Sequence, residues 1–113
     1  MPFFKKGPIR PDGGGELMMR EYEATYILRP DLEDEEKEQA AERIANVVTD
    51  NGGEIIDTDV WGSKSLAYEI NDYRSGHYTV LTFKAEGEVL NELKRNFKIM
   101  GEVLRHLVIR KED

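Results

Sequence analysis

The 113-residue sequence contains no cysteine, no long apolar run and only two histidines. Without cysteine it can form no disulfide, iron–sulfur cluster or thiolate zinc site. No apolar segment approaches the ~20 residues of a membrane-spanning helix, so we expect no membrane partner. Lys5 and Lys6 are not followed by an apolar segment, which argues against a secretory signal. These absences are compatible with a single domain in the reducing cytoplasm.

Basic residues are fewer than acidic ones, and the formal net charge is −7. Residues 1–18 hold three of the 16 cations and two of the 23 acidic residues, so residues 19–113 carry 13 against 21, a net charge of −8. Seven acidic and two basic residues fall between positions 33 and 50. Nucleic acid repels such a chain at long range. Composition alone therefore argues against RNA binding unless a basic partner takes part.

The first 18 residues differ in composition from the rest of the chain. Three prolines and four glycines leave no periodic pattern there, and the glycine run at 13–15 is typical of a flexible linker. We expect residues 1–18 to be a flexible N-terminal extension or an added leader, and residues 19–113 to form the folded domain. An alternative is that Phe3, Phe4 and Ile9 dock on a partner, but a disordered tail is the simpler interpretation.

Two segments carry apolar residues at helical spacing. In residues 33–51 the apolar positions follow one stripe, acidic residues crowd the first turns, and two glycines follow. Residues 87–100 show the same spacing, with basic residues in the later turns and a glycine after them. We therefore predict two helices over these ranges, the first of them capped by either Asp31 or Asp34.

Four other segments show the period of two that is typical of strands. Residues 20–28 alternate in this way until Pro30 stops them. Residues 77–85 are apolar on both faces, which predicts a central strand. The remaining strands are predicted over residues 54–70 and 103–111, with a turn over 71–76.

The resulting order of elements is β-α-β-β-α-β. This order predicts an α+β fold of the ferredoxin-like type, with two helices on one face of a four-stranded antiparallel sheet. The expected strand order is 4-1-3-2, which places the first and third strands in the middle.

The stretch from Trp61 to Ile70 is the most informative part of the chain. Leu66, Tyr68 and Ile70 fall two residues apart, so we predict that they share the buried face of a strand, with Ala67 and its polar neighbours on the other face. The full strand would span 17 residues, more than the usual length of about three to ten. A bulge or a projecting hairpin is therefore expected near Gly62, just before Lys64.

No catalytic or metal site is predicted. Ser63-Lys64-Ser65 could form a serine–lysine pair only in a dry pocket, and this stretch reads as an exposed bend. An acylphosphatase-like phosphate loop is a poor match, because a proline and an aspartate follow Arg29. His77 and His106 lie on different predicted strands, so we expect packed or surface histidines instead of metal ligands. We expect no cofactor and no small-molecule substrate.

RNA binding is the function that the residues leave open, in either of two modes. The aromatic third-strand signature of an RNA recognition motif is matched only loosely by residues 76–83, and Tyr22 and Tyr26 read as core. The other mode uses a few cations at the edge of the sheet to contact phosphates. The candidates for this role are Arg20, Lys64, Arg74, Arg105, Arg110 and Lys111, of which Arg20, Lys64 and Arg110 are favoured.

The run of residues 62–71, Gly-Ser-Lys-Ser-Leu-Ala-Tyr-Glu-Ile-Asn, resembles the signature of the bacterial small-subunit ribosomal protein six family. The residues that carry the motif are Gly62, Leu66, Ala67, Tyr68 and Ile70. Segments 19–23, 29–30, 61–62 and 103–110 agree as well, so the resemblance covers residues 19–113. One departure is Ser65, where the family usually carries a charged or amide residue, often Arg; this removes a potential phosphate contact.

The resemblance implies a structural, non-enzymatic role in the cytoplasmic ribosome. Family members bind the central domain, or platform, of small-subunit ribosomal RNA as a heterodimer with the strongly basic ribosomal protein eighteen. A basic partner would reconcile the acidic composition with RNA binding. The alternative is an acidic ferredoxin-like interaction or regulatory module not associated with ribosomes, and co-sedimentation with small subunits at moderate salt would distinguish the two.

Overall fold

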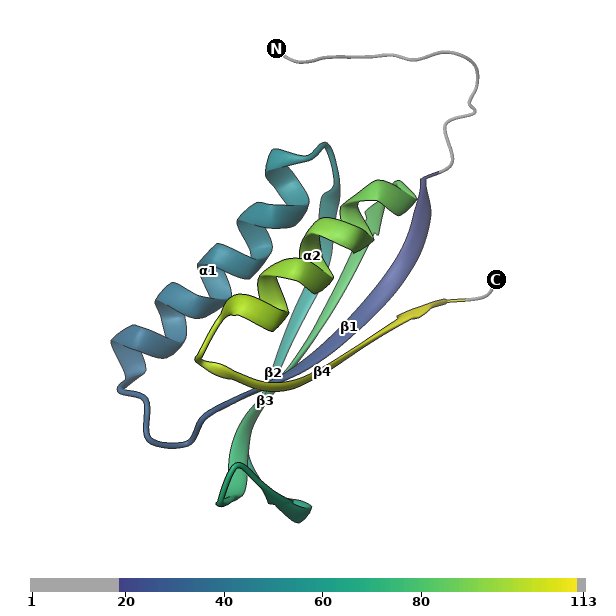
Figure 1. Cartoon of the computed structure of the whole chain (residues 1–113). Coiled ribbons are helices and arrows are strands. Elements are labelled where there is room, and N and C mark those ends of the chain that lie inside the picture. The colour runs from purple at the N-terminus through teal and green to yellow at the C-terminus, as the bar shows by residue number, and fades with distance from the viewer. Residues whose placement is uncertain (1–18, 112–113) are drawn as a thin grey trace.

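The computed structural model describes residues 19–111 (Figure 1). The expectations for residues 1–18 as an extension or leader lie outside the described residues. The elements are β1 (Arg20–Leu28), α1 (Asp34–Asp50), β2 (Glu54–Ile70), β3 (Tyr73–Ala85), α2 (Gly87–Ile99) and β4 (Val103–Arg110). None of the helices in this part of the chain has the length and apolarity needed to cross a membrane.

The four strands form one antiparallel sheet in the order β2-β3-β1-β4. This is the predicted order read from the opposite edge, with β1 and β3 central. Figure 1 shows both helices on one face of the sheet. The predicted ferredoxin-like α+β fold is therefore confirmed, and the sheet keeps a second face that neither α1 nor α2 covers, which we call the open face.

The core lies between the sheet and the helices. Alternate residues of β1 point toward the helices, and Tyr26 in this series is only 1% exposed. α1 contributes a buried stripe at helical spacing through Ala40, Ile44 and Val48, and α2 contributes Val89, Leu93 and Phe97 in the same way. The ring of Phe97 packs against that of Tyr26, with 5.6 Å between centroids. Apolar periodicity thus places both helices on the same face.

Two boundaries differ from those expected. β3 begins at Tyr73, four residues before the predicted strand, because the connection to β2 is a two-residue turn at Asn71 and Asp72, both with positive φ. Neither predicted cap begins α1; the N-cap is Glu33, whose backbone N–H donates to the Glu36 carboxylate at 2.9 Å. A glutamate three residues into a helix can satisfy a free N–H in this way, which explains the shift.

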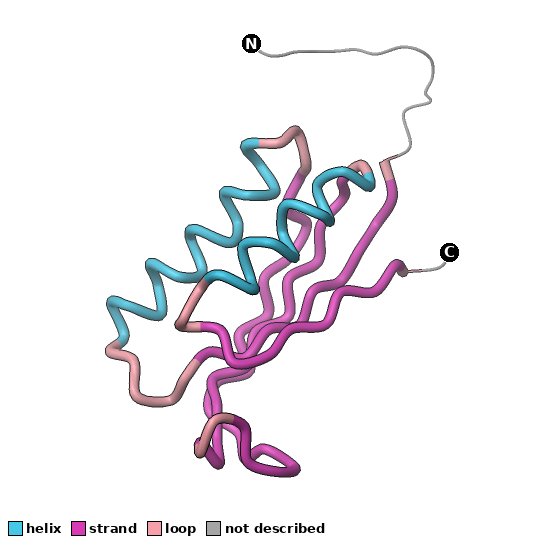
Figure 2. Tube along the Cα trace, viewed as in Figure 1, coloured by secondary structure: helices cyan, strands magenta, loops and turns pink. Residues whose placement is uncertain are grey.

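The β2–β3 hairpin is longer than the rest of the sheet. The β1–β3 ladder ends at the pair Leu28 and His77, whereas β2 and β3 continue to pair beyond it. We call residues 64–76 the distal hairpin; Figures 1 and 2 show it projecting past both helices and past the ends of β1 and β4. The predicted irregularity is also confirmed, because the register shifts between Val60 and Gly62.

The predicted buried face of the motif is wrong. Leu66 and Ile70 are only half-buried, Ala67 is exposed, and Tyr68 is 60% exposed. The alternation of residues in this stretch is real, but neither α1 nor α2 lies over the distal hairpin to bury either of its faces. The ladder also jumps from Ser65–Ser75 to Ile70–Tyr73, so β2 bends away from a regular strand here.

Candidate functional site

The six predicted phosphate contacts fall into two groups at opposite ends of β1. Arg20, Arg110 and Lys111 lie where β1 begins and β4 ends, while Lys64, Arg74 and Arg105 lie at or beside the distal hairpin. The structure therefore does not bring all six together into one patch.

In the first group, the two C-terminal cations are close to β1. Arg110 pairs with Tyr22, and the backbone N–H of Lys111 donates to the Glu21 carbonyl at 2.9 Å. The Lys111 ammonium forms an ion pair with the Glu21 carboxylate at 3.3 Å, which offsets part of its charge. Arg20 is exposed and forms no ion pair with any described residue. This leaves Arg20 better placed than Lys111 to attract a phosphate.

In the second group, two of the three cations are engaged within the chain. Arg74 Nε lies 2.8 Å from a carboxylate oxygen of Glu69. The guanidinium of Arg105 donates to the Tyr68 hydroxyl and lies 5.3 Å from the centre of its ring. Lys64 is exposed and has no carboxylate partner among the described residues. Lys64 is therefore the hairpin cation with the least compensated charge.

Trp61 was not among the predicted contact residues, yet it is central to this end of the sheet. Its ring stacks on Tyr78 with 6.5 Å between centroids and an angle of 11°, and its N–H donates to Asp59 at 2.9 Å. The Lys64 ammonium lies 5.6 Å from the Trp61 ring centre, within the range of a cation–π contact. The sequence signal for this site was the single tryptophan, Trp61, directly before a glycine. In the structure that glycine, Gly62, has a φ of 85°.

The open face carries an exposed apolar strip near its β4 edge. Leu107 is 62% exposed and Ile109 is 46% exposed, and both lie on the face opposite the helices. Tyr68 adds a third exposed apolar group beside the start of β4. Glu23 pairs directly with Ile109, so a carboxylate borders the strip. An exposed apolar surface with an acidic border suits a basic protein partner with an apolar contact surface.

Comparison with known proteins identifies the family. Residues 21–110 match the family model described as ribosomal protein S6. The chain is 50% identical over 94 residues to the small ribosomal subunit protein bS6 of Desulforudis audaxviator, covering 83% of this chain and 100% of that relative. It also resembles the crystal structure of 30S ribosomal protein S6 from Thermotoga maritima, with a TM-score of 0.79, 31% identity and coverage of 82% of this chain and 88% of that one. The chain belongs to the ribosomal protein S6 family.

Membership in the S6 family confirms the resemblance predicted from the motif. It places the chain among the proteins of the small ribosomal subunit, and thus in the cytoplasmic ribosome. RNA binding and a part in translation follow from the family, whose role is structural and not enzymatic.

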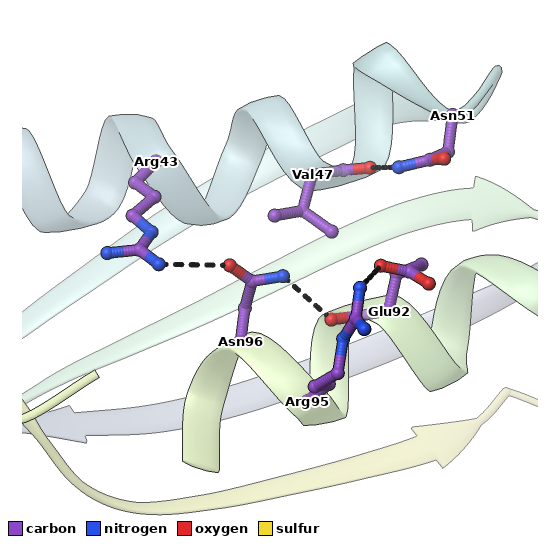
Figure 3. Close-up of polar contacts among 6 residues, drawn as sticks. All are labelled: Arg43, Val47, Asn51, Glu92, Arg95 and Asn96. Carbon is purple, nitrogen blue, oxygen red and sulfur yellow. Dashed lines mark hydrogen bonds and ion pairs between the residues drawn. The ribbon is translucent and has the colours of Figure 1, made fainter. Parts of the chain in front are cut away.

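A second place on the S6 fold where a ligand could be sought is a groove between the outer surfaces of α1 and α2, of about 400 Å³. Figure 3 shows its polar groups: Arg43 donates to the Asn96 side chain at 3.4 Å, and Asn96 donates to the Glu92 carbonyl at 2.9 Å. The Glu92 carboxylate is held by Arg95 at 2.6 Å. Each of these side chains is satisfied within the chain, so the groove reads as a polar helix–helix seam.

The two histidines lie on different strands, His77 on β3 and His106 on β4. No cluster of three or more possible ligands occurs in residues 19–111. His106 stacks on Phe97 with 4.8 Å between ring centres, and its burial, together with Lys98 and Lys94, lowers its pKa below the ordinary value. Burial and then Lys37 also lower the pKa of His77, against a smaller opposing effect of Asp34. The lowered pKa favours the neutral imidazole at both positions.

Proposed function

We propose that this chain is a structural component of the small ribosomal subunit that binds the central domain, or platform, of the ribosomal RNA together with ribosomal protein eighteen. Family membership over residues 21–110 supports the ribosomal part of this proposal. The RNA site and the protein partner are inferred from the charges and the exposed surfaces of this chain.

The open face is the observation that supports a protein partner. Tyr68, Leu107 and Ile109 expose apolar surface that a monomeric protein normally buries, and Glu23 borders it. The whole chain has a net charge of −7, which opposes binding to RNA. A basic partner seated on this strip would cover the apolar surface and supply the positive charge that the chain lacks.

The RNA contacts that we propose are chosen by the charge and by the position of the cations. Lys64 and Arg20 have no carboxylate partner among the described residues, and each lies at an end of the sheet. Arg110 lies beside Tyr22 near Arg20 and is included with it. Arg74 and Lys111 are assigned weaker contributions, because Glu69 and Glu21 offset their charge.

The test is a titration of a central-domain RNA fragment with this chain alone and with the chain plus ribosomal protein eighteen. We expect weak binding by the chain alone and much tighter binding by the pair. Equal affinities would contradict a partner that supplies charge. A chain that stays in the supernatant when small subunits are sedimented at moderate salt would contradict the ribosomal assignment.

Lys64→Glu tests the proposed contact at the hairpin. If Lys64 neutralises a phosphate, the variant pair binds RNA more weakly, and the slope of log K against log salt falls in magnitude by about one. Folding stays within about 0.5 kcal/mol, because the side chain is exposed. Lys94→Glu on α2 makes the same charge change on the helical side and serves as the control. An unchanged slope for Lys64→Glu would remove this residue from the interface.

A further inference from the structure

The distal hairpin needs support that the sheet does not give it. Beyond the pair Leu28–His77 neither β1 nor β4 pairs with its two strands, and Figure 2 shows neither α1 nor α2 over them. An isolated two-stranded hairpin is only marginally stable in water. The base of the hairpin is packed tightly against β1. Gly76 lies so close to Ile27 that a Cβ on residue 76 would clash with Ile27 Cγ2. Contacts nearer the tip must restrain the rest.

One such contact joins the hairpin to the opposite edge of the sheet. The Arg105 guanidinium donates to the Tyr68 hydroxyl and lies 5.3 Å from the ring centre. Tyr68 belongs to β2 and Arg105 to β4, which are the two edge strands of the sheet. The interaction therefore joins the two edge strands near the end of β1, where Arg105 pairs with Ile27, and it holds the irregular part of β2 toward the open face.

A second contact joins the hairpin to the loop between β1 and α1. The Tyr73 hydroxyl donates to Asp31 Oδ2 at 3.0 Å. The other oxygen of Asp31 lies 3.6 Å from Arg29 Nε, so the carboxylate is itself held in place. This contact restrains β3 on the helix side of the hairpin, whereas Arg105 restrains β2 on the open face. The two contacts act on different strands.

We infer that Tyr68, Arg105, Tyr73 and Asp31 are positioning residues that fix the distal hairpin in one orientation. The inference rests on the proposed function in one respect: the fixed orientation serves to present Lys64 to the assembled RNA and protein partner. A hairpin that is already ordered loses less conformational entropy on binding, and the complex is tighter for that reason. Arg105 then contributes to affinity through Tyr68 and not as a phosphate ligand.

The first experiment needs neither RNA nor partner. Tyr68→Phe and Tyr73→Phe each remove one hydroxyl and keep the ring. We expect backbone amides of residues 64–76 to exchange with solvent about fivefold faster, the effect of losing one net hydrogen bond. Tyr78→Phe is the control, because no hydrogen bond of the Tyr78 hydroxyl to a described residue is present. Unchanged exchange in both variants would overturn the inference.

The second experiment separates positioning from direct contact in the complex with RNA and ribosomal protein eighteen. Arg105→Lys keeps the charge but loses the planar group that stacks on Tyr68. We expect it to weaken binding about as much as Tyr68→Phe does, with an unchanged salt slope. The double variant Tyr68→Phe, Arg105→Lys should bind no more weakly than either single variant, because both substitutions remove the same interaction.

A different result would identify Arg105 as a phosphate ligand. In that case the Arg105→Lys variant would bind RNA with normal affinity, and Arg105→Gln would lower the salt slope by about one. Tyr68→Phe would then leave the affinity for RNA unchanged. Failure of the unsubstituted pair to bind RNA would sink the proposed function instead. The exchange rates of the hairpin in the free protein would still decide whether the four residues restrain it.

Discussion

Two tyrosines show how far burial decides the role of a residue in this chain. Tyr26 is 1% exposed and packs on Phe97, whereas Tyr68 is 60% exposed on the distal hairpin. We predict that Tyr26→Ala lowers the free energy of unfolding by about 3 kcal/mol or more, because it empties a packed site. Tyr68→Ala should cost less than about 1 kcal/mol, since it leaves no cavity. Urea unfolding of both variants measures the difference.

The same pair separates stability from binding. Tyr68→Ala should impair binding of the partner and RNA while the protein stays folded, because the exposed ring belongs to the strip beside Arg105. A loss of stability as large as that of Tyr26→Ala would show that the hairpin ring is part of the core. Apolar identity and spacing could not distinguish these two tyrosines, because both belong to alternating segments.

The packed histidines make stability depend on pH. The pKa of His106 is lowered by burial and by Lys98 and Lys94, so the unfolded chain binds a proton more readily than the folded chain. The stabilising contribution is complete above the ordinary value of 6.5 and is lost as the pH falls through the lower folded pKa. We predict that His106→Gln flattens the acid side of the stability profile, measured by urea unfolding between about pH 7.5 and 5.

His77 provides the comparison for that profile. Its pKa is also lowered, by burial and then by Lys37, so His77→Gln should remove a further part of the same slope. The double variant should then show the smallest change of unfolding free energy with pH over this range. A steeper loss of stability on acidification in His106→Gln would contradict the assigned direction of the shift.

At the scale of elements, the turn of the distal hairpin places two residues with side chains in a backbone region that glycine adopts most easily. Asn71 and Asp72 have φ of 51° and 71°, and Ile70 pairs with Tyr73 across them, as in a two-residue turn of the primed class. Glycine adopts such angles at no steric cost, whereas Asn and Asp tolerate them at a small cost that is lower than for other L residues. We predict that Asp72→Gly stabilises the hairpin by up to about 1 kcal/mol, seen as slower amide exchange around the turn.

Ser65→Gly is the matched control on the same hairpin. Ser65 does not have a positive φ, so glycine there relieves no strain and only adds freedom to the unfolded chain. We expect faster exchange in that variant. Slower exchange in both would mean that glycine acts on the hairpin in some way other than through the backbone angles of the turn.

The elements themselves were predictable because their signals are local. Each strand or helix that packs on the core shows its own period, and the strand order follows from the β-α-β-β-α-β sequence. The irregularity at Gly62 was predictable from a strand of 17 residues, which is too long to be covered. The start of β3 was missed because polar residues such as Arg74 and Ser75 also suit a turn.

The site was less predictable because it depends on what lies over each element. The sequence of residues 64–70 gives no sign that α1 and α2 end before the distal hairpin. The alternation of residues there therefore predicted burial that the structure does not show. The contact between Tyr68 and Arg105 joins residues 37 positions apart and arises only when β2 bends at its bulge. The individual cations could be read from the sequence, but which of them are engaged by carboxylates could not.

At the scale of the whole molecule, a large share of the net negative charge lies on one helix. α1 alone carries six acidic and two basic residues, a net charge of −4 out of −7 for the chain. α1 packs on the face of the sheet opposite the open face (Figure 1). The proposed interface and the main source of repulsion are thus separated by the thickness of the sheet and the core. RNA and the basic partner can approach the open face without touching α1.

This separation predicts how neutralising α1 will act. The triple variant Glu35→Gln, Glu38→Gln, Glu42→Gln removes three exposed charges and spares the capping residue Glu36. At about 0.01 M salt, where charges act over ~30 Å, the pair with ribosomal protein eighteen should associate with RNA several-fold faster than the unsubstituted pair. At about 1 M salt, where the range is ~3 Å, the association rates should be equal. Stopped-flow mixing at the two salt concentrations measures both rates. An acceleration that persists at high salt would place α1 in contact with the RNA, and the open face would then not be the only binding surface.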